Sequence, residues 1–350
     1  MIQHWLKPLS KNLIEHISQY NMSQRVDFHH TTFPKLEKNS IVIFGVDENY
    51  DAVRKVLYSN LQWHFGNTVI ADLGNLKKGE EMHLQPIVQE LIEGNIFPII
   101  LGLEGNLQNV VERILVSKYH KINIASIDSK INFLNKTSIN YIPIGYQQHF
   151  IDPEIFDKLD LNLRNHLRLG QFKANNEDAE VLLRSSTFAK FDVSCIRGSD
   201  APGQLDASPN GLYSEEWCLL NRFSGISDAT KIVGISGYAP DLDIQNMTAK
   251  LLAQGIWYLI EGFSDRMGDY PYSLNNLVEY VVDIQSLDQY MIIFWKSTKS
   301  GRWWLEIDKT NLKTKNQKML IPCTYNDYLK ASNNEIPDRL IKAISFLDED

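Results

Sequence analysis

Short apolar runs alternate with amphipathic segments along the first two thirds of the chain. The apolar runs are typical of strands buried on both faces, and they occupy residues 40–45, 68–74, 97–102, 122–128, 188–196 and 231–236. Apolar positions at helical spacing predict helices over residues 50–61, 84–94, 107–118, 155–159, 177–184, 215–223 and 247–263. Because strands and helices alternate with short connections, the pattern predicts parallel βαβ units and a three-layer α/β/α fold with a mostly parallel sheet.

The last part of the chain has a different pattern. Residues 289–295 and 302–307 are aromatic and β-branched, and a short polar segment with a glycine joins them, which predicts a β-hairpin. A short helix is expected over residues 338–347. We therefore expect an α/β domain over residues 1–285, with a helical lead-in at 1–38, and a hairpin-and-helix extension over 286–350 packed on it. Trp295, Trp303 and Trp304 favour packing of this extension against the main domain, because such rings bury large areas. A partner-binding surface is the alternative.

Composition narrows the class of protein. The chain has 350 residues, a formal net charge of −8 and a pI near 5.6, so general attraction to nucleic acid or to anionic membranes is not expected. No apolar run approaches the ~20 residues that span a bilayer, and polar residues interrupt the N-terminal segment where a signal peptide would be apolar. Cys195, Cys218 and Cys323 are odd in number and widely spaced, which favours reduced thiols in a cytoplasmic protein.

The segment 188–203, FAKFDVSCIRGSDAPG, is typical of a strand that ends at a loop carrying chemistry. Ligands in open α/β sheets bind beyond the carboxyl ends of the strands. The loop supplies Arg197, Asp200 and Asn210 as candidate ligand-binding residues, with Arg197 suited to pair with a carboxylate. A long, well hydrogen-bonded connection is an equal alternative. Cys195 could serve as a nucleophile only beside a histidine or a positive charge, and strand periodicity places it on the face opposite Asp192 and Ser194, so a buried core thiol is favoured.

Several segments in order resemble one family. They are IVIFGVDEN, VIADLGN, FPIILGLEGN, NIASIDSKIN, FDVSCIRGSDAPG, NGLYSEE and IVGISGYAPDLD, the last followed by Thr248 and Ala249. Together they resemble the arginase/agmatinase/formimidoylglutamase (ureohydrolase) family over most of residues 40–265, with formimidoylglutamase-like members the most similar. The resemblance implies a trimer or hexamer and a pair of Mn²⁺ ions, held by two histidines and four aspartates, that turn a bridging water into hydroxide.

The chemistry of these motifs is where the chain departs from the family. The family's metal-ligand positions read Gly105 (with Glu104 before it), Asp128, Lys130, Asn132, Asp192 and Ser194, and its substrate-facing glutamate falls on Gly237. Only Asp128 and Asp192 survive as ligands. Because hard dications bind where anionic oxygens are concentrated, no metal or other cofactor is expected, and Mn²⁺ is expected only if the site has been rebuilt.

Lys130 is the substitution with the clearest electrostatic consequence. We expect its ammonium to lie between Asp128 and Asp192, where it would replace the charge of the metals. A structural ion-pair group is the favoured reading of these three residues. The alternative is a new active site with Lys130 as base or nucleophile, although flanking carboxylates stabilise the charged form of a lysine.

Two functions from different classes follow. The first is a non-catalytic family homologue that binds a small molecule bearing guanidino, formimino or carboxylate groups, or acts through an oligomeric or regulatory surface, including one on an active paralogue. The second is an active C–N hydrolase of formimidoylglutamate or a guanidino compound with a rebuilt or reduced metal site. A homo-oligomer is expected in either case. An open polar pocket over the motif residues would favour chemistry or binding, whereas a filled site would favour a purely structural remnant.

Overall fold

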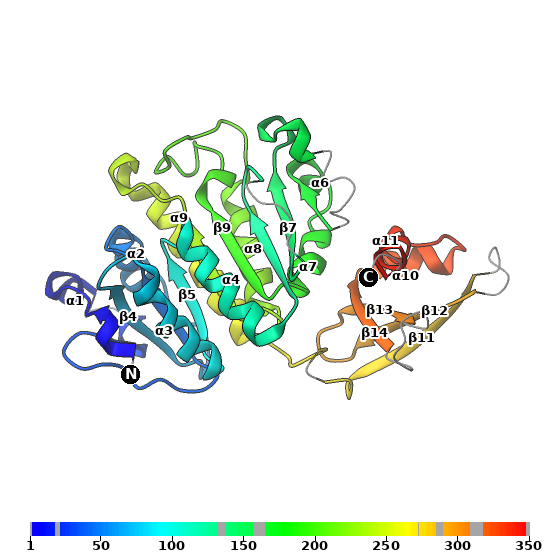
Figure 1. The fold of residues 1–350 in the computed structure, drawn as a ribbon, viewed down its shortest axis with the longest axis horizontal. Helices are drawn as coiled ribbons and strands as arrows, with labels where there is room; N and C mark the ends of the chain where they lie inside the picture. Colours follow the sequence, from blue (N-terminus) through cyan, green and yellow to red (C-terminus); the bar gives the residue numbers. More distant parts are fainter. Residues whose placement is uncertain are drawn as a thin grey trace.

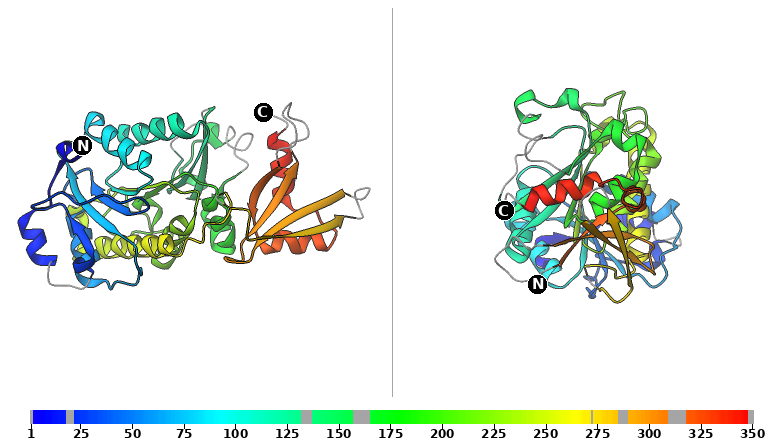
Figure 2. Two further views of the ribbon diagram at one scale, coloured as in Figure 1. Left: turned by 90° about the horizontal axis from the view of Figure 1, so that it is seen from below. Right: turned by 90° about the vertical axis from the view of Figure 1, so that its right-hand side faces the viewer.

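The chain forms a large sheet between two layers of helices and a smaller sheet at its C-terminal end (Figure 1). The computed structural model describes residues 2–17, 22–131, 137–156, 165–271, 273–284, 290–308 and 318–347. The N-terminus lies in the main body and the C-terminus in the part with the smaller sheet, which extends from one end of the main body (Figure 2). Within the described residues, no helix is long and apolar enough to cross a membrane.

The large sheet is parallel apart from one short edge strand. Its order is β1 (Leu6–Lys7), β4 (Ile70–Leu76), β3 (Ile41–Gly45), β5 (Phe97–Leu101), β10 (Ile232–Ser236), β9 (Phe188–Asp192), β6 (Ile122–Ile127), β7 (Ile139–Tyr146) and β8 (Leu167–Arg168), and β2 (Val26–Phe28) also pairs with β4. Only β1 runs antiparallel to its neighbour. Every residue of β3, β4, β5 and β10 is buried, which explains the continuous apolar runs in the sequence.

Helices cover both faces of this sheet and enclose two apolar cores. One face carries α1 (Lys11–Ile17), α2 (Asp51–Asn60), α6 (Leu169–Ala174), α7 (Glu177–Arg184), α8 (Ser214–Ile226) and α9 (Met247–Ser264). The other face carries α3 (Glu81–Glu93) and α4 (Asn106–Tyr119). Short 3₁₀ helices lie at Ile2–Trp5, Ser23–Arg25, Gln148–Phe150, Val193–Cys195, Pro240–Leu242 and Ile244–Asn246. The predicted three-layer α/β/α architecture with a mostly parallel sheet is confirmed.

Several strands of the large sheet differ from the sequence pattern, including β1 and β2 within the segment expected as a helical lead-in. β7 was not predicted, because Asn140, Pro143 and Gly145 interrupt its apolar run, yet it pairs in parallel with β6 along its length. The strand expected over 188–196 ends at Asp192, whose side chain accepts a hydrogen bond from the Ser194 amide and starts a 3₁₀ turn. The helix expected over 155–159 lies partly outside the described residues.

The C-terminal part contains more structure than a hairpin. The predicted hairpin is confirmed as β12 (Tyr290–Ser297) and β13 (Trp303–Asp308), and the predicted terminal helix as α11 (Asp338–Leu347). β11 (Leu277–Ile284) and β14 (Lys318–Cys323) complete an antiparallel four-stranded sheet, and α10 (Tyr325–Ser332) is a further helix. This sheet begins at Leu277, and the domain division at residue 285 stays a prediction. Trp304 is buried beside Arg184 of α7, whereas Trp303 packs within the core of the C-terminal sheet and Trp295 is half-buried.

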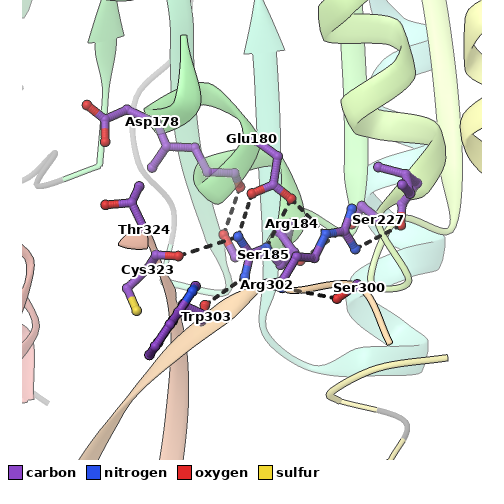
Figure 3. A network of polar contacts seen from close by, with 12 residues as sticks. Asp178, Glu180, Arg184, Ser185, Ser227, Ser300, Arg302, Trp303, Cys323 and Thr324 are labelled. Carbon is purple, nitrogen blue, oxygen red and sulfur yellow. Dashed lines mark hydrogen bonds and ion pairs between the residues drawn. The ribbon is translucent and has the colours of Figure 1, made fainter. Parts of the chain in front are cut away.

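Charged side chains connect the main body to the smaller sheet (Figure 3). Arg184 of α7 is 6% exposed, and its Nη1 donates to the carbonyl oxygen of Trp303 at 2.7 Å. Glu180 of the same helix accepts from Arg184 Nε at 3.1 Å and pairs with Arg302 Nε at 3.1 Å. Two arginines from different parts of the chain thus share one carboxylate at the junction.

Candidate functional site

A polar pocket of about 590 Å³ opens at the carboxyl ends of β6, β9 and β10, beside the start of α4. Its lining residues are Glu104, Gly105, Asn106, Gln108, Asn109, Glu112, Ser126, Ile127, Asp128, Tyr141, Lys190, Asp192, Ser236 and Gly237. Glu104 is exposed at the pocket's mouth, whereas Glu112 is buried and accepts a 2.8 Å hydrogen bond from the Tyr141 hydroxyl. The pocket therefore runs from the surface to a buried polar end between α4 and the sheet.

The two surviving carboxylates, Asp128 and Asp192, are linked by a serine. The Ser194 amide donates to Asp192 Oδ1 at 2.9 Å, and the Ser194 hydroxyl donates to Asp128 Oδ1 at 3.2 Å. Ser236 donates to Asp192 Oδ2 at 2.7 Å. Ser194, which stands where the family motif has a ligand, is thus a hydrogen-bond donor to both carboxylates.

The surroundings of the pair raise the pKa of Asp128. Burial and the negative charge of Asp192 raise the pKa of Asp128 to about 6, although the Lys130 amide, Ser194 and the positive charge of Lys190 act in the opposite direction. Two carboxylates that share donors and are partly withdrawn from water repel each other, and protonation of one relieves that repulsion.

The expected position of Lys130 is wrong. Its Nζ lies 3.2 Å from Asp206 Oδ2, its side chain is 41% exposed, and it lies 5.7 Å from the ring centre of Phe150. Only its backbone amide reaches the pair, donating to Asp128 Oδ1 at 2.9 Å. This turn directs the side chain outward, so Lys130 is not the cation between the carboxylates, and the exposed ammonium is a poor candidate for a base.

Lys190 is the cation that sequence reasoning missed. It lines the pocket, and its charge acts on Asp128. Lys190 lies two residues before Asp192 on β9, so both side chains project from the same face of the sheet. The sequence contained an indication of this lysine. Residues 190–192 read Lys-Phe-Asp where the family motif has S-F-D, and a lysine inside a buried strand is unusual.

Glu104 and Gly237 lie together at the mouth. Glu104 Oε1 accepts a 2.8 Å hydrogen bond from the Gly237 amide. Gly237 has φ +82°, and a Cβ there would lie 2.8 Å from Asp192 Oδ1. The family's glutamate therefore does not fit at position 237 in this backbone, and the nearby carboxylate comes from Glu104 instead.

The predicted ligand-binding residues are engaged by other groups of the protein and are not among the residues that line the pocket. Arg197 Nε donates to Asp200 Oδ1 at 2.7 Å, and its guanidinium lies 4.3 Å from the ring centre of Tyr213. Burial acts to raise the pKa of Asp200, but hydrogen bonds from Arg197, Ser214 and Ser199 outweigh burial and lower this pKa. A ligand-binding role for Arg197 and Asp200 stays a prediction.

Asn210 and Cys195 also serve the structure of this region. Asn210 Nδ2 donates to Gln147 Oε1 at 2.9 Å, and its ligand-binding role likewise stays a prediction. Cys195 is fully buried, and burial, then Asp192 and Asp128, raise the pKa of its thiol well above the usual range. Cys195 is therefore a core thiol, as expected.

The residues present do not fit a dimanganese centre. Position 105 has no side chain, Lys130 points to Asp206, and Ser194 donates to the surviving carboxylates. Across the ranges that the structure describes, no three histidine, cysteine, aspartate or glutamate side chains are grouped so as to hold a metal ion. Asn132, at another ligand position, lies outside the described residues. Two hydrogen-bonded carboxylates provide too few anionic donors for two hard dications.

The order of the mostly parallel sheet is that of an arginase-like α/β fold. The fold matches the manganese-bound formiminoglutamase of Trypanosoma cruzi with TM-score 0.59 and 17% identity, covering 67% of this chain and 96% of that one. It matches formimidoylglutamase of Bacillus subtilis with TM-score 0.61 and 14% identity, covering 71% and 93%. Agmatine ureohydrolase of Thermoplasma volcanium gives TM-score 0.53 and 17% identity, covering 65% and 90%.

No protein-family model and no curated protein matches the sequence. The chain has the fold of the arginase superfamily, the formiminoglutamases and agmatinases among them, as the motifs predicted. At this level of identity the likeness concerns the fold. Function has to be argued from the pocket itself.

Proposed function

We propose that this protein is a non-catalytic member of the arginase-like fold that binds a small cationic ligand, an amine or an amidine, in the polar pocket. The observation that carries the proposal is the donor set around Asp128 and Asp192. Serines hydrogen-bond to both carboxylates, and Lys190 supplies positive charge nearby. Two hydrogen-bonded carboxylates are too few to hold a pair of metal ions, so the family's route to a hydroxide nucleophile has no support in these residues.

The charge of the pocket favours a cation. Among the described lining residues, Glu104, Glu112, Asp128 and Asp192 are acids, and Lys190 is the only base. Amide and hydroxyl groups occupy much of the remaining wall, which suits a ligand with several N–H donors. A volume of about 590 Å³ lies within the range of small-molecule sites. An open polar pocket is also what distinguishes a binding site from a filled structural remnant.

Metal content and ligand binding together test the proposal. Protein purified with added Mn²⁺ should contain no stoichiometric metal by elemental analysis, and Mn²⁺ should leave the melting temperature unchanged. Agmatine and putrescine should bind in calorimetry, while glutarate, a dianion, should not. One to two Mn²⁺ per chain, together with release of urea from a guanidino substrate or of formamide from a formimino substrate, would refute the proposal and establish the hydrolase alternative.

A matched pair of variants locates the ligand. Glu104→Gln removes one carboxylate at the mouth, and the weaker attraction should reduce agmatine affinity about tenfold. Glu177→Gln changes an exposed glutamate on α7, away from the pocket, and should leave the affinity unchanged. Equal effects of both variants would show that agmatine binds by general attraction to an acidic protein. Homo-oligomerisation is proposed from the resemblance alone, and light scattering of the purified protein tests it.

A further inference from the structure

A crevice separates α7 from the C-terminal sheet, and it is distinct from the polar pocket. Two cavities, of about 380 and 320 Å³, adjoin there and share Asn165, Leu182, Arg339 and Lys342. We name the smaller one the junction cavity. It is built from both parts of the chain, since α7 belongs to the main body and β14 and α11 to the C-terminal part (Figure 1). Ligand sites occur preferentially at such boundaries between parts of a protein.

The junction cavity has an extended apolar wall. Val181 and Leu182 of α7 line one side, and residues 319–322 of β14 line the other. β14 pairs only with β13 in the described sheet, so it is an edge strand, and the cavity runs along four consecutive residues of it. This wall fits the hydrocarbon or aromatic body of a ligand, because contact with it removes apolar surface from water.

The polar lining of the cavity includes a pair of fixed asparagines. Asn123 and Asn140 lie side by side on β6 and β7, where Asn140 Nδ2 donates to Asn123 Oδ1 at 3.1 Å. Asn123 Nδ2 in turn donates to the carbonyl oxygen of Ser185 at 2.9 Å. These bonds fix the two amides at one end of the apolar wall, where they offer neutral hydrogen-bonding groups and no charge.

The charged residues that line the junction cavity in the described part of the chain are Arg339 and Lys342, and both are cationic. Arg339 is held in place by Asp178 of α7 at 2.7 Å and by Asp327 of α10 at 3.1 Å. Those two acids line the neighbouring cavity, not this one. Among described residues the two bonds use Nε and Nη2 of Arg339, so Nη1 remains to donate to a ligand.

We propose that the junction cavity binds a small organic anion with an apolar body, of the class of medium-chain or aromatic carboxylates. The apolar body lies between α7 and β14, and the carboxylate lies near Arg339 and Lys342. Bound there, the ligand contacts both parts of the chain and stabilises their junction. This inference does not depend on the function proposed for the polar pocket.

Three probes with the same chain length test the charge preference in the full-length protein. Octanoate should bind in calorimetry and raise the melting temperature, whereas octylammonium and octan-1-ol should bind at least tenfold more weakly. Octanoate should also slow amide exchange in β14 and α7, on both sides of the cavity. Failure of octanoate to bind, or equal binding of octylammonium, would overturn the proposal.

Variants test whether octanoate binds in the junction cavity. Lys342→Gln changes an exposed side chain and should weaken octanoate binding about tenfold, because a charge-assisted contact is lost. Lys55→Gln, on the exposed face of α2, is the matched control and should change nothing. Ala343→Trp should fill the cavity and abolish binding. If that variant is unstable, the lysine pair still decides, and equal affinities of the two lysine variants would refute the proposed site.

Discussion

Replacing Arg184 by methionine should loosen the junction between the main body and the C-terminal sheet. The side chain of Arg184 is 5% exposed, and its guanidinium bonds to Glu180 and to the carbonyl oxygens of Trp303 and Cys323 (Figure 3). It also lies 5.0 Å from the ring centre of Trp304. Methionine keeps much of the apolar stem and removes every one of these polar contacts.

The size of the loss can be worked from those contacts. The Trp303 carbonyl, within 2.7 Å of Nη1, loses this donor in a buried position, which costs about 1–3 kcal/mol. The contact with the Trp304 ring adds about 1 kcal/mol. Glu180 retains Arg302 at 3.1 Å, so its charge does not become unpaired. We therefore expect the free energy of unfolding to fall by about 3 kcal/mol.

Urea denaturation, with amide exchange of β13 and β14 as a local readout, measures this effect. Because the chain has two sheets, the loss should show first as faster exchange in the C-terminal sheet. Arg113→Met is the matched control. Arg113 pairs with Glu81 at 2.7 Å, but their side chains are 59% and 46% exposed, so its loss should cost less than about 1 kcal/mol.

Comparing the two variants tests the role of Arg184 at the junction. Equal losses for Arg184→Met and Arg113→Met would show that burial and the bonded carbonyls at the junction contribute nothing. A large loss with unchanged exchange in the C-terminal sheet would show that Arg184 stabilises α7 alone. Either result would refute the role assigned to this arginine.

Three further predictions concern the polar pocket and the thiols. In the urea assay, Gly237→Ala should lower the free energy of unfolding by more than the about 1–2 kcal/mol expected from its φ of +82°. The added Cβ would lie 2.8 Å from Asp192, which increases the cost. Gly66→Ala, at φ +53° with nothing within 4 Å of its Cβ, is the control and should show the backbone cost alone. The pKa of Asp128 is raised from 3.8 to about 6, so above pH 4 the folded protein retains a proton that the unfolded chain has lost. The free energy of unfolding should therefore fall, by at most about 3 kcal/mol, as pH rises from 4 to 6, and Asp128→Asn should remove that decline; an unchanged pH profile in the variant would exclude Asp128 as its source. All three cysteines are buried, so an aromatic disulfide reagent should label them only after unfolding, and fast labelling of the native protein would contradict the structure.

The main fold could be read from the sequence because its physical cause is local. Strands of a parallel sheet covered on both faces are buried throughout, and the apolar runs at 40–45, 97–102 and 231–236 therefore stand out. β7 was not predicted because Pro143 and Asn140 interrupt its apolar run, and only its pairing with β6 identifies it as a strand. The strands β11 and β14 were likewise not predicted, because pairing with their partners in the second sheet stabilises them.

The site was only partly readable for a related reason. The motif resemblance grouped Asp128, Asp192 and Glu104 near the ends of predicted strands, and the structure brings all three to the lining of the pocket. The tertiary structure decided which lysine accompanies them. Lys130 follows a strand in a turn that directs it to Asp206, whereas Lys190 lies within a strand and shares its face with Asp192. Side-chain direction after a strand depends on hydrogen bonds of the turn, and those bonds exist only once distant segments have packed together.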